Sequence, residues 1–174
     1  AGRIFGLLGP NGAGKTTTLR ILSTLIPPTS GRATVGGSGV TEDPSGVRAR
    51  IGFLTGTTGL YPRLTARETV RYFAGLYGLA PGAAEARIDD LFARLEITPF
   101  QDKRCSDLST GMKQKVSIAR AIVHDPPVLI LDEPTTGLDV LASRHLVEFI
   151  RQSREEGKCV LFSTHIMSEA ERLC

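Results

Sequence analysis

The first residues with recognisable chemistry form a glycine-rich segment close to the start of the chain. In order, they are Gly9, Pro10, Asn11, Gly12, Ala13, Gly14, Lys15, Thr16 and Thr17. All but the last fit the pattern G-x-x-x-x-G-K-[ST], whose glycines let the backbone wrap around an anion with several N–H groups pointing inward. Lys15 can reach the terminal phosphates of a nucleotide, and the Thr16 hydroxyl can bind Mg²⁺. The segment therefore predicts a cradle for a nucleoside triphosphate.

Two acidic residues, Asp132 and Glu133, follow directly after the apolar run of residues 128–131. Such a run predicts a buried strand, and parallel sheets bind their ligands outside the carboxyl ends of the strands. We therefore expect Asp132 beside the phosphate cradle, where it can hold Mg²⁺ directly or through water. Glu133 can orient and polarise an attacking water molecule. Adjacent acids with these separate tasks favour hydrolysis over transfer to a bulky acceptor.

The elements that must position these residues alternate between short apolar runs and amphipathic stretches, a pattern typical of α/β folds. Continuous apolar strands of this kind favour a parallel sheet that is covered on both faces. Residues 4–8, 128–131 and 160–162 are expected to be buried strands, and residues 50–54 a further short strand.

Residues 9–14 are expected to form a glycine-rich turn. One helix is expected directly after this turn, and another after Asp139. The first should end at Pro27-Pro28, because proline cannot continue a helix. The residues expected to face the core are Ile21, Leu22 and Leu25 in the first helix and Leu146, Phe149 and Ile150 in the second.

A mostly helical stretch, residues 61–122, interrupts this alternation. Thr65 and Glu68 fit a capping box, in which the hydroxyl and the carboxylate bond to free backbone N–H groups at a helix start. Pro81-Gly82 breaks the stretch. Apolar residues recur at helical spacing on either side of it, at Val70, Phe73, Ala74 and Tyr77, and at Ile88, Leu91, Phe92 and Leu95. We expect a helical lobe of about residues 61–125, inserted into an α/β core of residues 1–60 and 126–174.

The composition narrows the setting in which this chemistry takes place. Apolar residues make up 41% and charged residues 22% of the 174 residues, which is ordinary for one globular domain. The net charge of +3 is slight and the basic residues are scattered, so we expect no nucleic-acid partner. Cys105, Cys159 and Cys174 are far apart, which favours free thiols in a reducing cytosol. No run reaches the roughly 18 apolar residues of a membrane span and no signal peptide is seen. Work at a membrane would then proceed from the cytosolic side through a partner.

Further segments resemble, in order, the motifs of ABC ATPases. Residues 108–115 read Leu-Ser-Thr-Gly-Met-Lys-Gln-Lys and resemble the signature motif of that family, usually written L-S-G-G-Q. Residues 134–139 resemble its D-loop, and residues 163–165 its switch-histidine segment. With the cradle and the two acids, the motifs run from Gly9 to His165, nearly the whole chain. This ordered set is far more specific than any one motif.

Within that family, the sequences of the cradle and of residues 51–55 and 108–115 most resemble those of the ATP-binding subunits of bacterial sodium exporters and related drug or polysaccharide exporters. The resemblance implies a P-loop ATPase with an inserted helical subdomain and with ATP and Mg²⁺ as cofactors. It implies export, of sodium ions or drugs, through a membrane permease partner. The chain would then work as a peripheral subunit at the cytoplasmic face of the cell membrane.

The resemblance also implies how the site works. Two cassettes, identical or different, pair head to tail, so that each ATP lies on one cradle and under the partner's signature motif. Ser109, Thr110 and Gly111 would act in trans on the γ-phosphate, His165 would bond to that phosphate and to the attacking water, and Asp139 would lie at the dimer interface. Plainer roles remain open, since Ser109 and Asp139 could each be the N-cap of a helix.

Several features depart from the family pattern. Gly56 stands where most members have a glutamine that touches Mg²⁺, so we assign no metal role to this loop. Thr110 replaces a glycine and Met112 a glutamine of the signature motif, which leaves contacts from these two positions open. The adenine-stacking aromatic of the family normally lies upstream of Ala1. We therefore expect both ends to be cut short relative to a longer subunit.

Two other functions compete with transport. A soluble ABC ATPase of DNA repair or translation would typically carry coiled coils, zinc modules or a second cassette, none of which these residues contain. A P-loop kinase would need an acceptor-binding lid and would not need residues 109–111 or His165. The exporter-like sequences of the motifs favour transport. Hydrolysis of ATP without any acceptor would distinguish an ATPase from a kinase.

Overall fold

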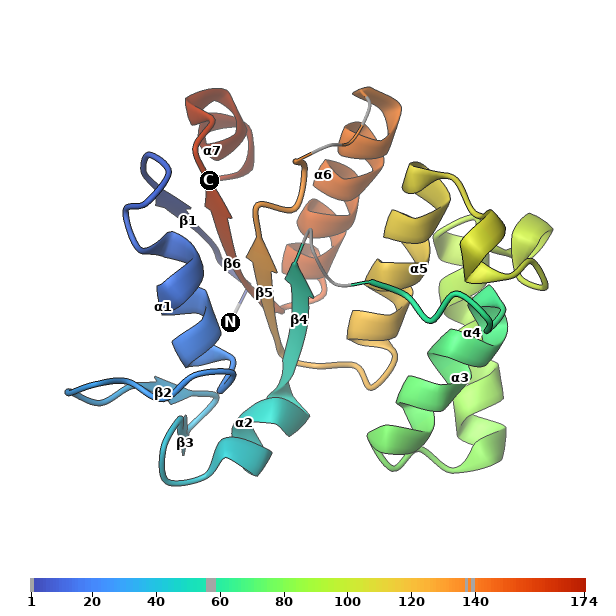
Figure 1. Ribbon diagram of the computed structural model, residues 1–174, viewed down its shortest axis with the longest axis horizontal. Coiled ribbons are helices and arrows are strands. Elements are labelled where there is room, and N and C mark those ends of the chain that lie inside the picture. The colour runs from blue at the N-terminus through green and yellow to red at the C-terminus, as the bar shows by residue number, and fades with distance from the viewer. Residues whose placement is uncertain (1, 56–58, 137, 139) are drawn as a thin grey trace. The chain divides into compact units, whose positions relative to one another are not determined.

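A computed structural model describes residues 2–55, 59–136, 138 and 140–174, without the side chain of residue 141. The chain divides into two compact units (Figure 1). The first unit consists of Ala1–Gly56 and Pro126–Cys174, and the second of Thr57–Asp125. The units are an α/β unit and a helical unit, as the predicted fold class requires.

The α/β unit is built on a parallel sheet with the strand order β1-β6-β5-β4. The strands are β1 (Ile4–Leu8), β4 (Ile51–Thr55), β5 (Val128–Asp132) and β6 (Cys159–Thr164). Leu8 pairs with Thr164, and Asp132 with Ser163, so β1, β5 and β6 end at the same edge. The predicted parallel sheet is confirmed. Asp132 and the start of the glycine-rich loop both lie at its carboxyl edge.

The prediction that residues 4–8 form a buried strand is wrong in its burial. Among the described strands, β1 pairs with β6 alone and lies at the edge of the sheet. Phe5 is therefore 50% exposed and Leu8 40% exposed. An apolar run predicts a strand, but it does not show whether other elements will cover both faces of that strand.

Helices cover both faces of this sheet. On one face, α1 (Lys15–Leu22), α2 (Pro44–Arg50) and the hairpin of β2 (Thr34–Val35) and β3 (Ser38–Gly39) enclose a buried cluster. Its members are Leu19, Val35, Val40, Val47, Ile51 and Ile130. On the other face lie α6 (Val140–Glu155) and α7 (Met167–Leu173). Here a Cβ on Gly6 would come within 3.2 Å of Phe162 Cζ and Cys174 Sγ, so a larger residue would require these side chains to shift slightly.

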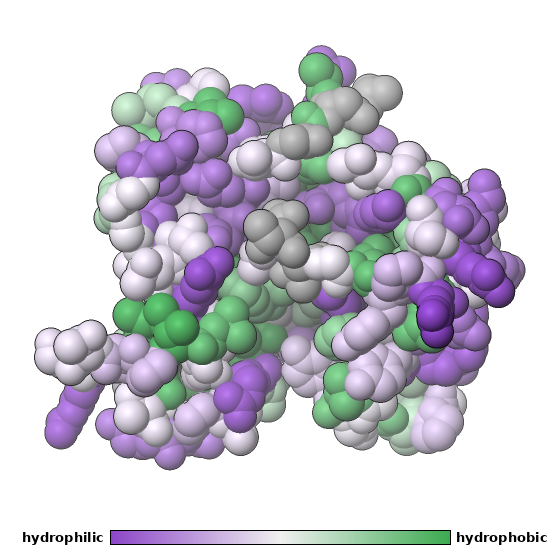
Figure 2. Space-filling view, viewed as in Figure 1, coloured by the Kyte–Doolittle hydropathy of each residue, from purple (hydrophilic) through white to green (hydrophobic). Residues whose placement is uncertain are grey.

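The helix after the cradle ends earlier than the sequence predicts. Helix α1 stops at Leu22, because Thr24 adopts a left-handed φ of 61° and the N–H groups of Thr24 and Leu25 return to Ile21 O and Arg20 O. Leu25 consequently lies outside the helix and is 59% exposed. Figure 2 shows apolar surface near this end of α1. A threonine in this conformation is uncommon, so the early stop could not be predicted.

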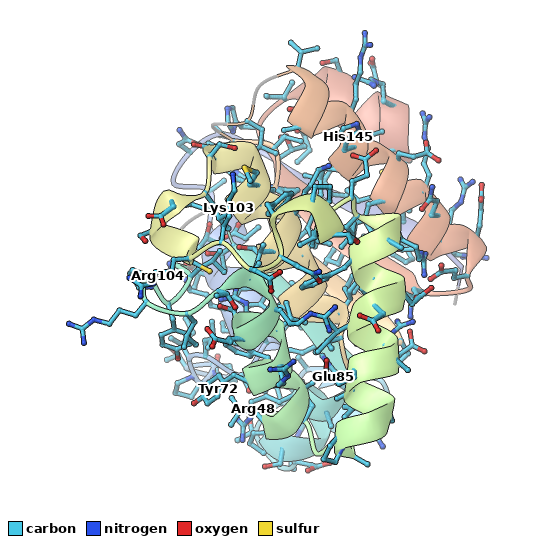
Figure 3. All side chains as sticks on the ribbon, turned by 90° about the vertical axis from the view of Figure 1, so that its right-hand side faces the viewer. Arg48, Tyr72, Glu85, Lys103, Arg104 and His145 are labelled. Carbon is cyan, nitrogen blue, oxygen red and sulfur yellow. The ribbon has the colours of Figure 1, made fainter. Side chains whose placement is uncertain are left out.

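Helix α2 was not predicted, although its signals are present. Asp43 is its N-cap and accepts a hydrogen bond from the Gly46 N–H (2.9 Å), and Pro44 occupies the first helical position. Because α2 ends at Arg50, strand β4 begins one residue later than predicted. The later helix, α6, agrees with the prediction, and Leu146, Phe149 and Ile150 are buried. His145, on its exposed face, is a surface residue (Figure 3).

The second unit packs α3 (Ala66–Leu76) against α4 (Pro81–Arg94) and α5 (Thr110–Ile122). Two short 3₁₀ turns, Thr98–Phe100 and Cys105–Asp107, connect α4 to α5. Pro81 is the first residue of α4 rather than only a break. Glu85 of α4 pairs with Arg67 and Arg71 of α3 and lies between these helices (Figure 3). No helix in the described ranges is long and apolar enough to cross a membrane.

The predicted capping box at the start of α3 is present and gives a stability test. Thr65 Oγ1 accepts from the Glu68 N–H (3.1 Å), and Glu68 Oε2 accepts from the Thr65 N–H (2.8 Å). Thr65→Ala should lower the free energy of unfolding by about 1 kcal/mol, because one N–H group loses its partner. Thr65→Ser keeps the hydroxyl and should stay near wild type in denaturant unfolding. Equal midpoints for the alanine variant and wild type would rule out a contribution from the cap.

Candidate nucleotide site

The glycine-rich loop lies between the end of β1 and the start of α1, in the predicted setting. Gly12 and Gly14 have φ of 82° and 88°, in the left-handed region that favours glycine, and Gly14 is the N-cap of α1. A Cβ would meet nothing within 4 Å at either residue, so backbone conformation rather than space requires the glycines. The loop borders a hollow of about 460 Å³. Its lining consists of Asn11, Gly12, Gly14, Lys15, Thr16, Thr17 and Glu133.

The Lys15 side chain contacts this loop through its ammonium group, and the side chain is almost fully buried, with 6% exposed. Lys15 Nζ donates to Gly9 O (2.8 Å) and Pro10 O (3.0 Å). It also lies 3.5 Å from Glu133 Oε1. The helix start, with its N–H groups and positive dipole end, and this buried cation make the loop an anion site.

Thr16 and Asp132 come together although they are far apart in the sequence. Thr16 Oγ1 donates to Asp132 Oδ1 at 3.0 Å, which joins α1 to the end of β5. Asp132 is 8% exposed. A hydroxyl and a carboxylate oxygen beside a phosphate cradle are the ligand types that Mg²⁺ takes in nucleotide sites, so these residues fit that ion.

Glu133 lies where three groups meet. Its Oε1 is 3.5 Å from Lys15 Nζ and 3.4 Å from His165 Nδ1, and its Oε2 accepts from Thr136 Oγ1 (3.3 Å). Its φ of 45° is left-handed, a conformation that costs a non-glycine residue about 1–3 kcal/mol. The geometry brings together Lys15, Glu133 and His165 at the carboxyl edge of the sheet.

His165 follows β6 in a turn that hydroxyl groups and one carboxylate hold in place. Thr164 Oγ1 accepts from the Ile166 N–H (3.0 Å) and donates to Glu169 Oε2 (2.6 Å). Thr135 Oγ1 donates to Glu169 Oε1 (2.6 Å). Glu169 thus ties the loop after Glu133 to the turn that carries His165. Glu169 was not among the predicted site residues, and its one local signal is that it is an acidic residue in the first turn of α7.

The predicted signature residues lie in the helical unit. Ser109 is the N-cap of α5, and its hydroxyl accepts from the Met112 N–H (3.3 Å), so the N-cap role is confirmed. Thr110 and Gly111 form the first turn of that helix. Their contact with a nucleotide on a second cassette stays a prediction. Asp139 and Gly56 lie outside the described residues.

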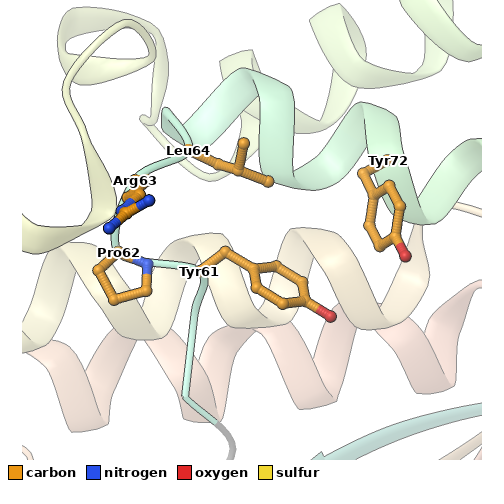
Figure 4. A pocket seen from close by; sticks show the side chains of 5 residues that line it. All are labelled: Tyr61, Pro62, Arg63, Leu64 and Tyr72. Carbon is orange, nitrogen blue, oxygen red and sulfur yellow. The ribbon is translucent and has the colours of Figure 1, made fainter.

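A second hollow, of about 450 Å³, lies in the helical unit and is mainly apolar. It is lined by Tyr61, Pro62, Arg63, Leu64 and Tyr72 (Figure 4). The rings of Tyr61 and Tyr72 meet edge to face, with centroids 5.8 Å apart, and are 49% and 48% exposed. Aromatic residues are enriched at protein interfaces, and exposed apolar patches mark interaction sites or ligand-binding grooves.

Comparison with known families agrees with the geometry of the α/β unit. Residues 1–136 match the family model described as "ABC transporter". Residues 103–171 also match a model described as "AAA domain, putative AbiEii toxin, Type IV TA system".

Curated relatives carry similar descriptions. The chain is 48% identical over 174 residues to the ABC transporter ATP-binding protein NatA of Bacillus subtilis (strain 168). This alignment covers 99% of this chain and 71% of that protein. It is 39% identical to the linearmycin resistance ATP-binding protein LnrL of the same strain, with coverage of 99% and 56%. It is 47% identical to the Nod factor export ATP-binding protein I of Paraburkholderia xenovorans (strain LB400), with coverage of 99% and 57%. The chain thus spans less than two thirds of the last two relatives.

Two solved structures have the same fold. An ATP-binding subunit of an ABC transporter superposes with a TM-score of 0.88 at 36% identity, covering 99% of this chain and 72% of that one. The cbiO1 protein of Clostridium perfringens, described as part of the ABC transporter complex cbiONQ, superposes with a TM-score of 0.86 at 28% identity. Its alignment covers 99% of this chain and 71% of that chain.

Proposed function

Because the chain belongs to the ABC transporter family of ATP-binding proteins, we propose that it hydrolyses ATP in a head-to-tail cassette dimer and thereby powers export through a membrane permease. The observation that carries this proposal is the convergence of the buried cation of Lys15, the Thr16–Asp132 pair, Glu133 and His165 beside one glycine-rich cradle. These groups suit phosphate binding and activation of water, and both are needed for hydrolysis.

In the proposed mechanism, the N–H groups of the loop and Lys15 bind the phosphates of ATP. Thr16 and Asp132 hold Mg²⁺, which when bound neutralises charge on the phosphate oxygens. Lys15 exchanges its bonds with Gly9 O and Pro10 O for phosphate oxygens, and in doing so releases Glu133. The carboxylate of Glu133 then orients the attacking water.

His165 is the second group proposed to act on the reacting atoms. Its imidazole lies 3.4 Å from Glu133 Oε1, so it can bond to the γ-phosphate and the same water. The Glu169 hydrogen bonds support this role, because they fix the turn in which His165 lies. Catalysis is then mainly positioning and charge stabilisation, as phosphoryl transfer requires.

A second cassette completes the site in this proposal. Ser109, Thr110 and Gly111 begin a helix of ordinary length, and such a start is a good anion site. They would contact the γ-phosphate that the partner holds. Asp139 is proposed at the interface between the two cassettes.

Export through a permease is proposed from the relatives and from one surface. The names of two relatives refer to export of a Nod factor and to resistance to linearmycin. By analogy, this chain serves an exporter, for sodium ions or drugs, from the cytoplasmic face of the membrane. The apolar hollow at Tyr61 and Tyr72 favours a protein partner, and we propose that this partner is the permease.

The experiment that tests this proposal is a pull-down of the tagged full-length protein from detergent-solubilised native membranes, with mass spectrometry of the co-purifying proteins. We expect a multi-span membrane protein in stoichiometric amount. Recovery only from the soluble fraction, with ribosomal or DNA-repair partners, would end the transport proposal. ATP turnover in the absence of any acceptor, measured on the same sample, tests the hydrolytic part separately.

A further inference from the structure

Ser163 is the residue of β6 that pairs with Asp132 in the register of the sheet, and it is completely buried, with 0% exposed. Its hydroxyl makes two hydrogen bonds. Ser163 Oγ donates to Asp132 Oδ1 (2.7 Å) and accepts from the Glu133 N–H (2.9 Å). One side chain thus contacts both acidic residues of the proposed site.

The two bonds fix the direction of the hydroxyl. A backbone N–H can only donate, so the Ser163 oxygen must accept from Glu133, and its single proton remains for Asp132. Neither bond can be exchanged for one to bulk water, because Ser163 has no exposed surface. The hydroxyl is therefore held in one orientation.

Asp132 depends on this hydroxyl for its orientation. Its Oδ1 accepts from Ser163 at 2.7 Å and from Thr16 at 3.0 Å, so donors from β6 and α1 hold the same oxygen. A carboxylate with 8% exposure has little access to water, so these two donors largely determine its orientation. Loss of one of them would let the carboxylate rotate or bind an ion less well.

Glu133 depends on the same hydroxyl through its backbone. Its left-handed φ of 45° is unfavourable for a residue with a side chain, and its N–H bonds to Ser163. This bond holds the backbone of Glu133 in the conformation that directs its carboxylate toward Lys15 and His165. Without it, the Glu133 N–H would lack this partner and the turn could relax.

We propose that Ser163 is a positioning residue for ATP hydrolysis, which fixes the carboxylate of Asp132 and the backbone of Glu133 through one hydroxyl group. This inference rests on the roles proposed above for these two acids. It assigns to Ser163 no contact with ATP. Its loss should therefore affect metal binding and turnover but spare the binding of metal-free nucleotide.

The test compares Ser163→Ala with Ser153→Ala in the full-length protein. Ser153 is a matched control, because it is a buried serine (2% exposed) of α6 in the same unit. The first readout is a Mg²⁺ titration of the binding of a fluorescent, non-hydrolysable ATP analogue. The second readout is steady-state ATP turnover, with kcat and KM determined separately.

We expect Ser163→Ala to raise the Mg²⁺ concentration for half-maximal binding by about tenfold and to lower kcat by about tenfold or more, as for other residues that orient metal ligands. Binding of the analogue in EDTA should be unchanged, because Ser163 bonds to the two acids and not to the cradle. Ser163→Thr keeps the hydroxyl and should restore most of both quantities.

If the alanine variant does not fold, Ser163→Cys replaces it, because a thiol is close in size but a weak hydrogen-bond former. The same losses are expected for it. Values equal to those of Ser153→Ala in both readouts would overturn the inference. A wild-type protein that turns over no ATP would instead overturn the proposed function, so the two failures can be told apart.

Discussion

In the Glu133→Gln variant, ATP turnover should fall by at least about 100-fold while ATP stays bound. The amide keeps the size of the side chain but cannot accept a proton from water, and it removes the charge that faces Lys15 and His165. ATP held without hydrolysis should keep the two cassettes together. The measurements are steady-state phosphate release and the molecular mass of the full-length protein with ATP, by light scattering after gel filtration.

A matched control for this variant is Glu171→Gln, since Glu171 is an exposed acid of α7 in the same unit. It should turn over ATP at the wild-type rate and show no ATP-dependent increase in dimer lifetime. Turnover near wild type in Glu133→Gln would remove Glu133 from the catalytic role. It would then leave His165 as the proposed group nearest to the attacking water.

The Lys15→Met variant should lose ATP affinity rather than turnover alone. A buried ammonium group that bonds to phosphate oxygens contributes about 1.5–3 kcal/mol, so affinity should fall by roughly 10- to 100-fold. Methionine retains much of the length of the side chain, and the loop glycines are unaffected. The measurement is ATP binding by titration calorimetry in EDTA, where hydrolysis does not interfere.

Lys103→Met is the control for this measurement, because Lys103 is an exposed lysine of the helical unit (Figure 3). It should bind ATP as wild type does. An unchanged affinity in Lys15→Met would contradict the phosphate-binding role. It would indicate that Lys15 serves the structure of the loop, through its bonds to Gly9 O and Pro10 O.

The residues of the site were predictable where chemistry requires a residue type at a fixed spacing. The cradle, Thr16 and Asp132 follow from one pattern and one strand end, and the structure brings Thr16 and Asp132 within 3.0 Å. Helix and strand periods likewise predicted α6 and the parallel sheet. The supporting residues were not predictable, because Ser163 and Glu169 matter through neighbours that only the fold supplies.

Errors in the fold have similar physical causes. Leu25 has the spacing of a core residue, but the left-handed Thr24 turns the chain before it is reached. Phe5 lies in a convincing apolar run, but its strand is at the edge of the described sheet. In both cases the local pattern was read correctly, and a backbone conformation or a neighbour decided the exposure.

The strand order has a consequence for how the protein folds during translation. Among the four described strands of the parallel sheet, β6 is synthesised after the other three, yet it lies between β1 and β5. Until it leaves the ribosome, β1 and the cradle that follows it have no partner strand among those described. Such contacts between distant parts of a chain form slowly and leave strand edges open to wrong pairing. The phosphate site of the nascent chain should thus form only after β6 has left the ribosome, and chaperones should matter most before that point.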